Sequence, residues 1–194
     1  MKFVAVRVLA LVFVTLECSG DIKTRHTNIK CETLDKSVLE FPVCRLKVLG
    51  RGIIGASAHL KFRKLPLRSI LINLSSWKRV SGYQPFLFNV TVDFCRYIKH
   101  PNPLNFFHYF YLGIRTFINL NHTCPYNHDI ILKDFVLNDK MFAKVPFPKD
   151  SYMFSIKFAT NGVWTGIINS YLDINVDGDY DFAEWTTLYN SIML

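Results

Sequence analysis

Residues 85–95 read PFLFNVTVDFC, and apolar and polar side chains alternate along most of this stretch. The apolar members of the alternation are Phe86, Phe88, Val90, Val92 and Phe94, and the polar members are Asn89, Thr91 and Asp93. Successive side chains of a β-strand point to opposite faces of its sheet, so a period of two predicts a strand with one buried face. The stretch therefore predicts a sheet protein and sets the pattern to look for elsewhere.

The same alternation recurs on both sides of this stretch. Residues 56–64 place Ala58, Leu60 and Phe62 on one face and His59, Lys61 and Arg63 on the other; residues 67–77 place Ile70, Ile72 and Leu74 opposite Asn73 and Ser75. Further short strands are predicted at residues 129–137, 139–147, 151–159 and 164–176. Many short strands separated by turn residues indicate a mainly β sandwich or barrel.

One segment, residues 102–120, follows a helical period instead. Its apolar residues recur every three or four positions: Leu104, Phe107, Phe110, Tyr111, Ile114 and Phe117. Asn102 is the predicted N-cap, and Pro103 would occupy the first turn. We expect one amphipathic helix, inserted between strands, that lies on the sheets or over an opening between them.

The first twenty residues have the layout of a secretory signal peptide. Lys2 and Arg7 precede an apolar run at residues 8–16, and small residues follow. The run is too short to span a bilayer, and no membrane span is predicted elsewhere. We therefore predict a signal peptide at residues 1–20, one secreted domain at 21–178, and a C-terminal tail at 179–194 that is compatible with a short helix.

Cysteine and asparagine patterns fit the same compartment. Loss of Cys18 with the signal peptide leaves an even set, Cys31, Cys44, Cys95 and Cys124, which predicts two disulfides with three connectivities open. Three N-x-[ST] triplets predict glycosylation at Asn73, Asn89 and Asn121.

The formal net charge of +8 bears on the partners to expect. A basic surface attracts phosphates, but an exported chain rarely meets nucleic acid, so we expect none as a partner. Anionic lipid headgroups, glycans and acidic ligands remain. A predicted basic mouth comprises Arg63, Lys64, Arg68, Lys78 and Arg79. The alternative for these residues is an ordinary solvated loop face.

Residues 173–184, DINVDGDYDFAE, match the calcium-loop template of an EF-hand. The flanks argue against one, because Gly162 and Gly166 disfavour a helix upstream and the alternation of Ile168, Leu172 and Ile174 continues into the match. We predict the end of a strand here and no metal, with weak calcium binding at about millimolar concentration as the alternative.

Signatures of catalysis are missing from the sequence. No G-x-S-x-G elbow occurs, and the cysteines are those of a disulfide framework. His122 and His128 flank Cys124, but their spacing fits no zinc template. We expect a protein that is not an enzyme and that carries no cofactor.

Several longer stretches resemble a known family. Residues 81–98 (SGYQPFLFNVTVDFCRYI), 117–137 (FINLNHTCPYNHDIILKDFVL) and 145–158 (VPFPKDSYMFSIKF) are similar to a fly-expanded family of small secreted proteins with a domain of unknown function. Residues 31–44 (CETLDKSVLEFPVC) also fit. That family is related to the CheB chemosensory proteins and, more remotely, to the ML lipid-recognition superfamily.

The resemblance implies an immunoglobulin-like antiparallel β-sandwich whose sheets stand apart to admit a hydrophobic ligand. It also implies disulfides joining Cys95 to Cys124 and Cys31 to Cys44. The phenylalanines on the predicted inward faces and on the helix are the expected ligand-binding residues: Phe62, Phe86, Phe88, Phe107, Phe110, Phe154 and Phe158. The same residues would equally fill an ordinary sandwich core.

Two functions follow as hypotheses. The first is a secreted glycoprotein that binds a lipid or other small hydrophobic ligand between its sheets, in chemosensory or reproductive signalling, with an extracellular receptor as its partner. The second is an extracellular protein-interaction module with a closed core and no ligand.

Overall fold

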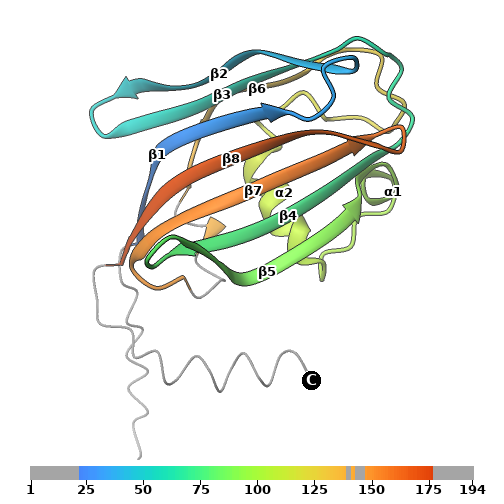
Figure 1. Cartoon of the computed structure of the whole chain (residues 1–194). Coiled ribbons are helices and arrows are strands. Elements are labelled where there is room, and N and C mark those ends of the chain that lie inside the picture. The colour runs from blue at the N-terminus through green and yellow to red at the C-terminus, as the bar shows by residue number, and fades with distance from the viewer. Residues whose placement is uncertain (1–21, 139–140, 143–146, 177–194) are drawn as a thin grey trace, which may run out of the picture.

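The computed structural model describes residues 22–138, 141–142 and 147–176, which fold into two antiparallel sheets packed face to face (Figure 1). The strands are β1 (Ile22–Thr33), β2 (Leu39–Gly50), β3 (Ile53–Phe62), β4 (Ile70–Arg79), β5 (Tyr83–Asp93), β6 (Ile130–Val136), β7 (Asp150–Thr160) and β8 (Val163–Val176). The helices are α1 (Phe94–Lys99) and α2 (Phe106–Ile114). The strand orders are β1-β8-β7-β4-β5 and β2-β3-β6, which confirms the predicted β-sandwich.

Strands with regular alternation lie where the sequence predicts them. In β3, Ala58, Leu60 and Phe62 are buried while Lys61 is exposed. The segments predicted near residues 129–137, 151–159 and 164–176 correspond to β6, β7 and β8. Burial of one face against the opposite sheet is what the period of two encodes, so the physical basis of the prediction holds.

One predicted strand boundary and one predicted strand are wrong. The strand predicted to reach Cys95 ends at Asp93, whose side chain accepts a hydrogen bond from the Arg96 backbone N–H at 3.0 Å and so caps α1. The strand predicted at residues 139–147 is also wrong in its described part. Met141 and Phe142 form a turn, in which Met141 N–H donates to the Asn138 carbonyl at 2.9 Å.

The helix is shorter than the predicted 102–120. Asn105, not Asn102, is the N-cap of α2, and its Oδ1 accepts from the Phe107 N–H at 3.0 Å. Asn102 makes a local turn instead, accepting from the Leu104 N–H, and Leu104 is 91% exposed. Two asparagines three residues apart compete for one cap, and the one nearer the buried aromatic residues forms it.

Two disulfides are present, with the pairing that the resemblance implied. Cys31–Cys44 joins β1, an edge of the five-stranded sheet, to β2, an edge of the three-stranded sheet. Cys95–Cys124 joins α1 to the segment that precedes β6. One bridge therefore holds the two sheets together along one side, and the other fixes the helical region to the approach of β6.

The calcium-loop match begins inside a strand, as predicted. Asp173 lies in β8 opposite Arg25 of β1, and their side chains form an ion pair of 3.2 Å. Its second carboxylate oxygen accepts from the Ser151 hydroxyl at 2.8 Å. Residues 177–184 of the match, the predicted signal peptide and the predicted tail lie outside the described residues.

Candidate functional site: an apolar cavity between the sheets

A cavity of about 180 Å³ lies between the two sheets. The five-stranded sheet contributes inward-facing residues of β4, β7 and β8, including Ile72, Ile156 and Ile168. The three-stranded sheet faces them with Ala56 of β3 and Leu132 of β6. The alternation that buries one face of each strand therefore lines the cavity as well as the core.

Helix α2 forms a further wall of the cavity. Four of its side chains line the space: Phe107, Phe110, Tyr111 and Ile114. The helix packs on the inner face of the five-stranded sheet through ring contacts of Phe106 with Phe88 (4.3 Å between centroids) and of Phe110 with Phe154 (5.5 Å). Three strands cannot cover five, and α2 covers part of the remaining face (Figure 1).

Met141, in the segment after β6, packs against α2 at Gly113. A Cβ at Gly113 would come within 2.5 Å of the Met141 side chain, so the glycine lets this methionine approach the helix backbone closely. Met141 and its neighbour Phe142 both line the cavity. A methionine is flexible and fills irregular space, so this side of the cavity can change shape when the Met141 side chain changes rotamer.

The polar atoms that reach the cavity are few. Tyr111, Ser170 and Thr160 are among the lining residues, but the surface of the cavity is almost entirely apolar. The Tyr111 hydroxyl donates to the Leu120 carbonyl at 2.9 Å, and the Ser170 hydroxyl lies 3.3 Å from His26 Nδ1. Thr160 Oγ1 is buried and has no hydrogen-bond partner among the described residues. A buried hydroxyl without a partner is costly.

Behind Ser170 lies a buried histidine, His26, which is only 1% exposed. The edge-on contact of its ring with Phe135 has a centroid distance of 5.4 Å. Burial lowers the pKa of His26 from 6.5 to about 4, and the Phe135 backbone opposes this shift in part. The imidazole is therefore neutral near neutral pH, and the cavity wall carries no charge there.

Four of the seven predicted phenylalanines line the cavity: Phe107, Phe110, Phe154 and Phe158. Phe62 is buried in the main core without lining it. Phe86 and Phe88 pack around Phe147 in a second cluster. The pairing of β4 with β5 shifts by two residues between Asn89 and Phe86, where Leu87 has a positive φ of 55°. A shift of two residues keeps Phe86 on the inner face, opposite Ser76, where it packs against Tyr152 and not at the cavity.

Aliphatic residues form most of the cavity wall, and the sequence-based prediction of ligand-binding residues, which named only phenylalanines, did not include them. Ile70, Ile72 and Leu74 line the cavity from β4, on the face that the alternation marks as buried. Their pattern was visible in the sequence. The alternation of apolar residues does not distinguish a residue that lines a cavity from a residue in a close-packed core.

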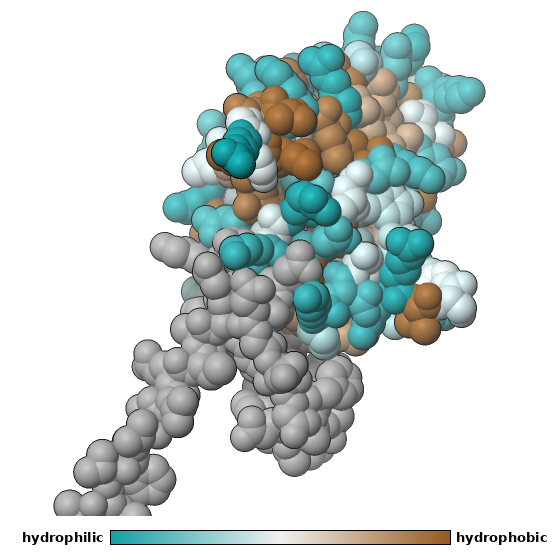
Figure 2. Space-filling model, turned by 90° about the vertical axis from the view of Figure 1, so that its left-hand side faces the viewer, coloured by the Kyte–Doolittle hydropathy of each residue, from teal (hydrophilic) through white to brown (hydrophobic). Residues whose placement is uncertain are grey.

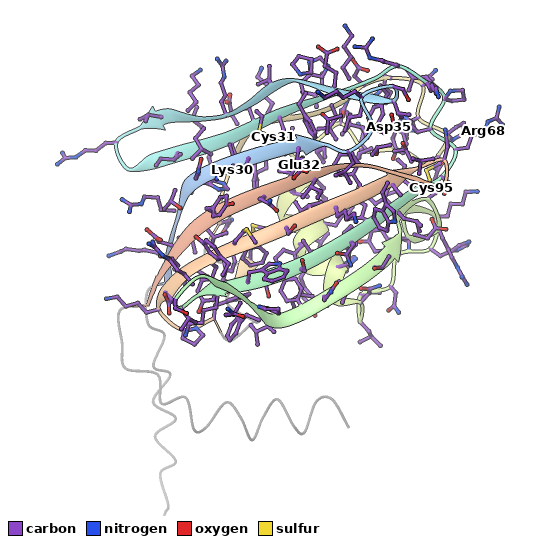
Figure 3. All side chains as sticks on the ribbon, viewed as in Figure 1. Lys30, Cys31, Glu32, Asp35, Arg68 and Cys95 are labelled. Atoms are coloured by element: carbon purple, nitrogen blue, oxygen red, sulfur yellow. A yellow bond between two sulfur atoms is a disulfide. The ribbon has the colours of Figure 1, made fainter. Side chains whose placement is uncertain are left out.

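The five predicted basic residues do not form one mouth. Arg63, Lys64 and Arg68 precede β4, whereas Lys78 and Arg79 end it, and the extended strand between them separates Arg68 from Lys78 by about 30 Å. Figure 3 shows Arg68 beside Cys95 at one end of the sandwich. Arg63 pairs with Glu40 (3.1 Å) and Lys78 with Asp150 (3.2 Å), both at the surface.

The predicted glycosylation sites differ in setting. Asn121 is exposed on a loop. Asn73 and Asn89 lie side by side on β4 and β5, and the Asn73 amide donates to Asn89 Oδ1 at 2.7 Å. Glycosylation at these positions stays a prediction, and the crowding of Asn73 and Asn89 makes a glycan on both unfavourable.

An apolar patch is exposed at the turn between β2 and β3. Val48 is 72% exposed and Ile53 48%, and the exposed Lys47 and Arg51 flank them. Figure 2, which looks onto the end of the sandwich at the left of Figure 1, shows hydrophobic surface in its upper part, where this hairpin lies. Contiguous apolar surface of this kind marks interaction sites more often than single exposed residues do.

Comparison with known proteins adds one match. Residues 72–154 match a family described as a protein of unknown function, DUF1091. The matched part runs from β4 to the middle of β7 and includes α2 and the Cys95–Cys124 disulfide. No curated protein matches the chain. This match does not address the relationships to CheB and ML proteins.

No helix in the described part of the chain has the length and apolar character needed to cross a bilayer.

Proposed function

We propose that the protein is a secreted, disulfide-bonded glycoprotein that binds a lipid or another small hydrophobic ligand between its two sheets. The observation that carries the proposal is the apolar cavity of about 180 Å³. Protein interiors are close-packed, and voids larger than a water molecule are few in a domain. Apolar cavities of this order stay dry and take up small apolar molecules.

The cost of the cavity supports a use for it. At the penalty measured for buried voids, about 180 Å³ corresponds to about 4 kcal/mol of lost stability. That is a large share of the roughly 5–15 kcal/mol by which a domain is stable. Bound ligand would restore the missing packing contacts, which explains why the wall consists almost entirely of aliphatic and aromatic side chains.

The wall offers a ligand almost no polar surface, which fits a ligand that is mainly hydrocarbon. The chain of a fatty acid or fatty alcohol would lie among Ile72, Ile156 and Ile168 and be held by apolar contacts. We assign the site a binding role and no catalytic step.

The compartment and the process belong to the same proposal. Two disulfides support an oxidising environment such as the extracellular space. The resemblance to CheB and ML proteins supports lipid recognition and a place in chemosensory or reproductive signalling, with an extracellular receptor as partner. The exposed apolar patch at Val48 and Ile53 favours the second candidate, an extracellular interaction module.

A thermal-shift experiment separates the two candidates. The mature protein, freed of bound lipid by organic extraction and refolding, is heated alone and with decanoic acid, palmitic acid, a long-chain alcohol and a sterol. A ligand present at about 100 times its Kd adds about 2.7 kcal/mol to the free energy of unfolding. Stabilisation by at least one class supports the carrier; no stabilisation by any class supports the interaction module instead.

A further inference from the structure

The segment before β6 carries two histidines on a firmly anchored loop. Cys124 is bonded to Cys95, and Tyr126 is fully buried. The backbones of Tyr126 and Leu67 exchange two hydrogen bonds, of 2.7 and 3.0 Å. His122 and His128 lie on either side of these anchors, so the loop fixes their relative position.

The hydrogen bonds of the two rings decide where each lone pair points. His122 Nδ1 lies 2.8 Å from the Thr123 carbonyl oxygen, and His128 Nδ1 lies 2.8 Å from the Asp129 carbonyl oxygen. A carbonyl oxygen only accepts, so each Nδ1 carries the proton of its ring. Each Nε2 of the neutral rings is then a bare lone pair, and the two Nε2 atoms are 3.2 Å apart.

Two lone pairs that face one another repel unless a cation lies between them. With metal–nitrogen bonds of about 2.0–2.1 Å and tetrahedral angles, two imidazole ligands of one zinc ion stand about 3.3 Å apart. Histidine ligands also characteristically donate their other ring N–H to a backbone carbonyl or a carboxylate. Both features are present at His122 and His128.

The competing arrangement is a simple hydrogen bond between the rings. It requires the other tautomer of His128, with Nδ1 accepting from the Asn119 amide at 3.2 Å and Nε2–H donating to His122. That tautomer would set the Nδ1 lone pair against the Asp129 carbonyl oxygen at 2.8 Å. The Asn119 amide donates to the same carbonyl at 2.8 Å in either case, so the close approach of His128 Nδ1 to this oxygen is what favours the first tautomer.

We propose that His122 and His128 together bind a divalent transition-metal ion, Zn²⁺ or Cu²⁺, through their Nε2 atoms. In the described part of the chain no three His, Cys, Asp or Glu residues gather at one point, so the protein supplies two ligands here and water completes the coordination. His122 is exposed, which leaves room for those waters. Oxygen-seeking Ca²⁺ and Mg²⁺ are not bound at two imidazoles.

Calorimetric titration of the secreted protein, produced without a histidine tag, tests the site. Zn²⁺ and Cu²⁺ should each bind with one ion per chain, and Mg²⁺ and Ca²⁺ should give no heat. His122→Ala and His128→Ala should each weaken Zn²⁺ binding at least tenfold. Because both ligands serve one ion, the double variant should lose little more than either single variant.

The matched control is His100→Ala, which removes one exposed imidazole at the end of α1. It should bind Zn²⁺ as the unchanged protein does. Absence of Zn²⁺ and Cu²⁺ binding, or equal binding by the His122→Ala and His128→Ala variants, would overturn the proposal.

A spectroscopic measurement on the unaltered protein guards against variants that fold poorly. The electron paramagnetic resonance spectrum of bound Cu²⁺ should show hyperfine splitting from two imidazole nitrogens. Splitting from one nitrogen or none contradicts the two-histidine site. Acidification from about pH 7.5 to about pH 5 should release the ion, because protons compete for imidazole lone pairs. The site lies outside the cavity wall, so neither result bears on hydrophobic-ligand binding.

Discussion

His26 shows at the scale of one residue how the cavity wall sets chemistry. Its ring is buried between the sheets, touches Phe135 edge-on and reaches Ser170 at the cavity. Removal from water disfavours the charged form, which lowers its pKa from 6.5 to about 4. The folded protein thus keeps a neutral imidazole where an unfolded chain would carry a charged one in mild acid.

We predict that this histidine makes the free energy of unfolding decrease as the pH is lowered. Between pH 6.5 and about pH 4 the unfolded chain binds a proton at His26 that the folded protein does not bind. The contribution of His26 to the free energy of unfolding is therefore present above pH 6.5 and is lost as the pH falls toward 4. The loss is about 3 kcal/mol. Urea unfolding at several pH values should show it, and His26→Leu should flatten that part of the profile. An unchanged slope in the variant would contradict the assignment.

At the scale of the element, the sequence predicted that helix α2 exists but not where it begins and ends. The aromatic periodicity identified its buried face, while two asparagines were available to begin it. Asn105 caps the helix and Asn102 makes a separate turn. A hydrogen bond to one N–H or another depends on the path of the preceding loop, which a pattern of apolar residues does not contain.

Substitution of the two asparagines tests this difference. Asn105→Ala should destabilise the protein by about 1 kcal/mol, because it removes an N-cap. Asn102→Ala removes only the local bond to the Leu104 N–H and should cost less. Thermal unfolding gives the free energies, and hydrogen exchange should locate the Asn105→Ala effect in residues 106–114. A larger loss of stability in Asn102→Ala than in Asn105→Ala would indicate that Asn102 is the N-cap, as the sequence alone predicts.

The strands show the same division between what a pattern contains and what it omits. β3 and most of β5 follow a strict alternation and were predicted. β1 and β2 were not, because polar residues dominate β1, and Pro42 coincides with a register shift in β2 that interrupts its period. A bulge moves every later side chain to the other face, so a period-two pattern is lost across it.

At the scale of the whole molecule, the alternation of apolar residues predicted a sandwich but not how its sheets are spaced; sheets that stand apart were implied by the family resemblance alone. Alternation says which residues point inward; the distance between sheets depends on side-chain volumes at facing positions. The Cys31–Cys44 bridge holds the edges β1 and β2 together, and α2 occupies inner face that the smaller sheet leaves uncovered. The cavity lies between the disulfide-linked edge strands and helix α2.

Removal of that bridge should loosen the sandwich as a whole. The bonded residues are separated by 13 positions, and closing a loop of this length restricts the unfolded chain by about 3 kcal/mol. The Cys31→Ser, Cys44→Ser double variant should lose roughly this much in urea unfolding. A loss well below 1 kcal/mol would show that packing alone holds the sheets together.

The central claim, that the space between the sheets is a ligand site, rests on a cavity that one larger side chain can partly fill. Ala56 lines the cavity, whereas Ala58, two residues along the same buried face of β3, does not. Ala56→Leu adds its methyl groups to empty space and should leave stability unchanged or raised. Ala58→Leu adds them to a packed core and should cost roughly 1–3 kcal/mol.

The most direct measurement is a titration of the two variants and the unchanged protein with a fluorescent fatty-acid analogue. The unchanged protein and Ala58→Leu should bind the probe with similar affinity, and Ala56→Leu should bind it at least tenfold more weakly. Equal binding by all three proteins, or binding by none of them, would contradict a ligand site in this cavity.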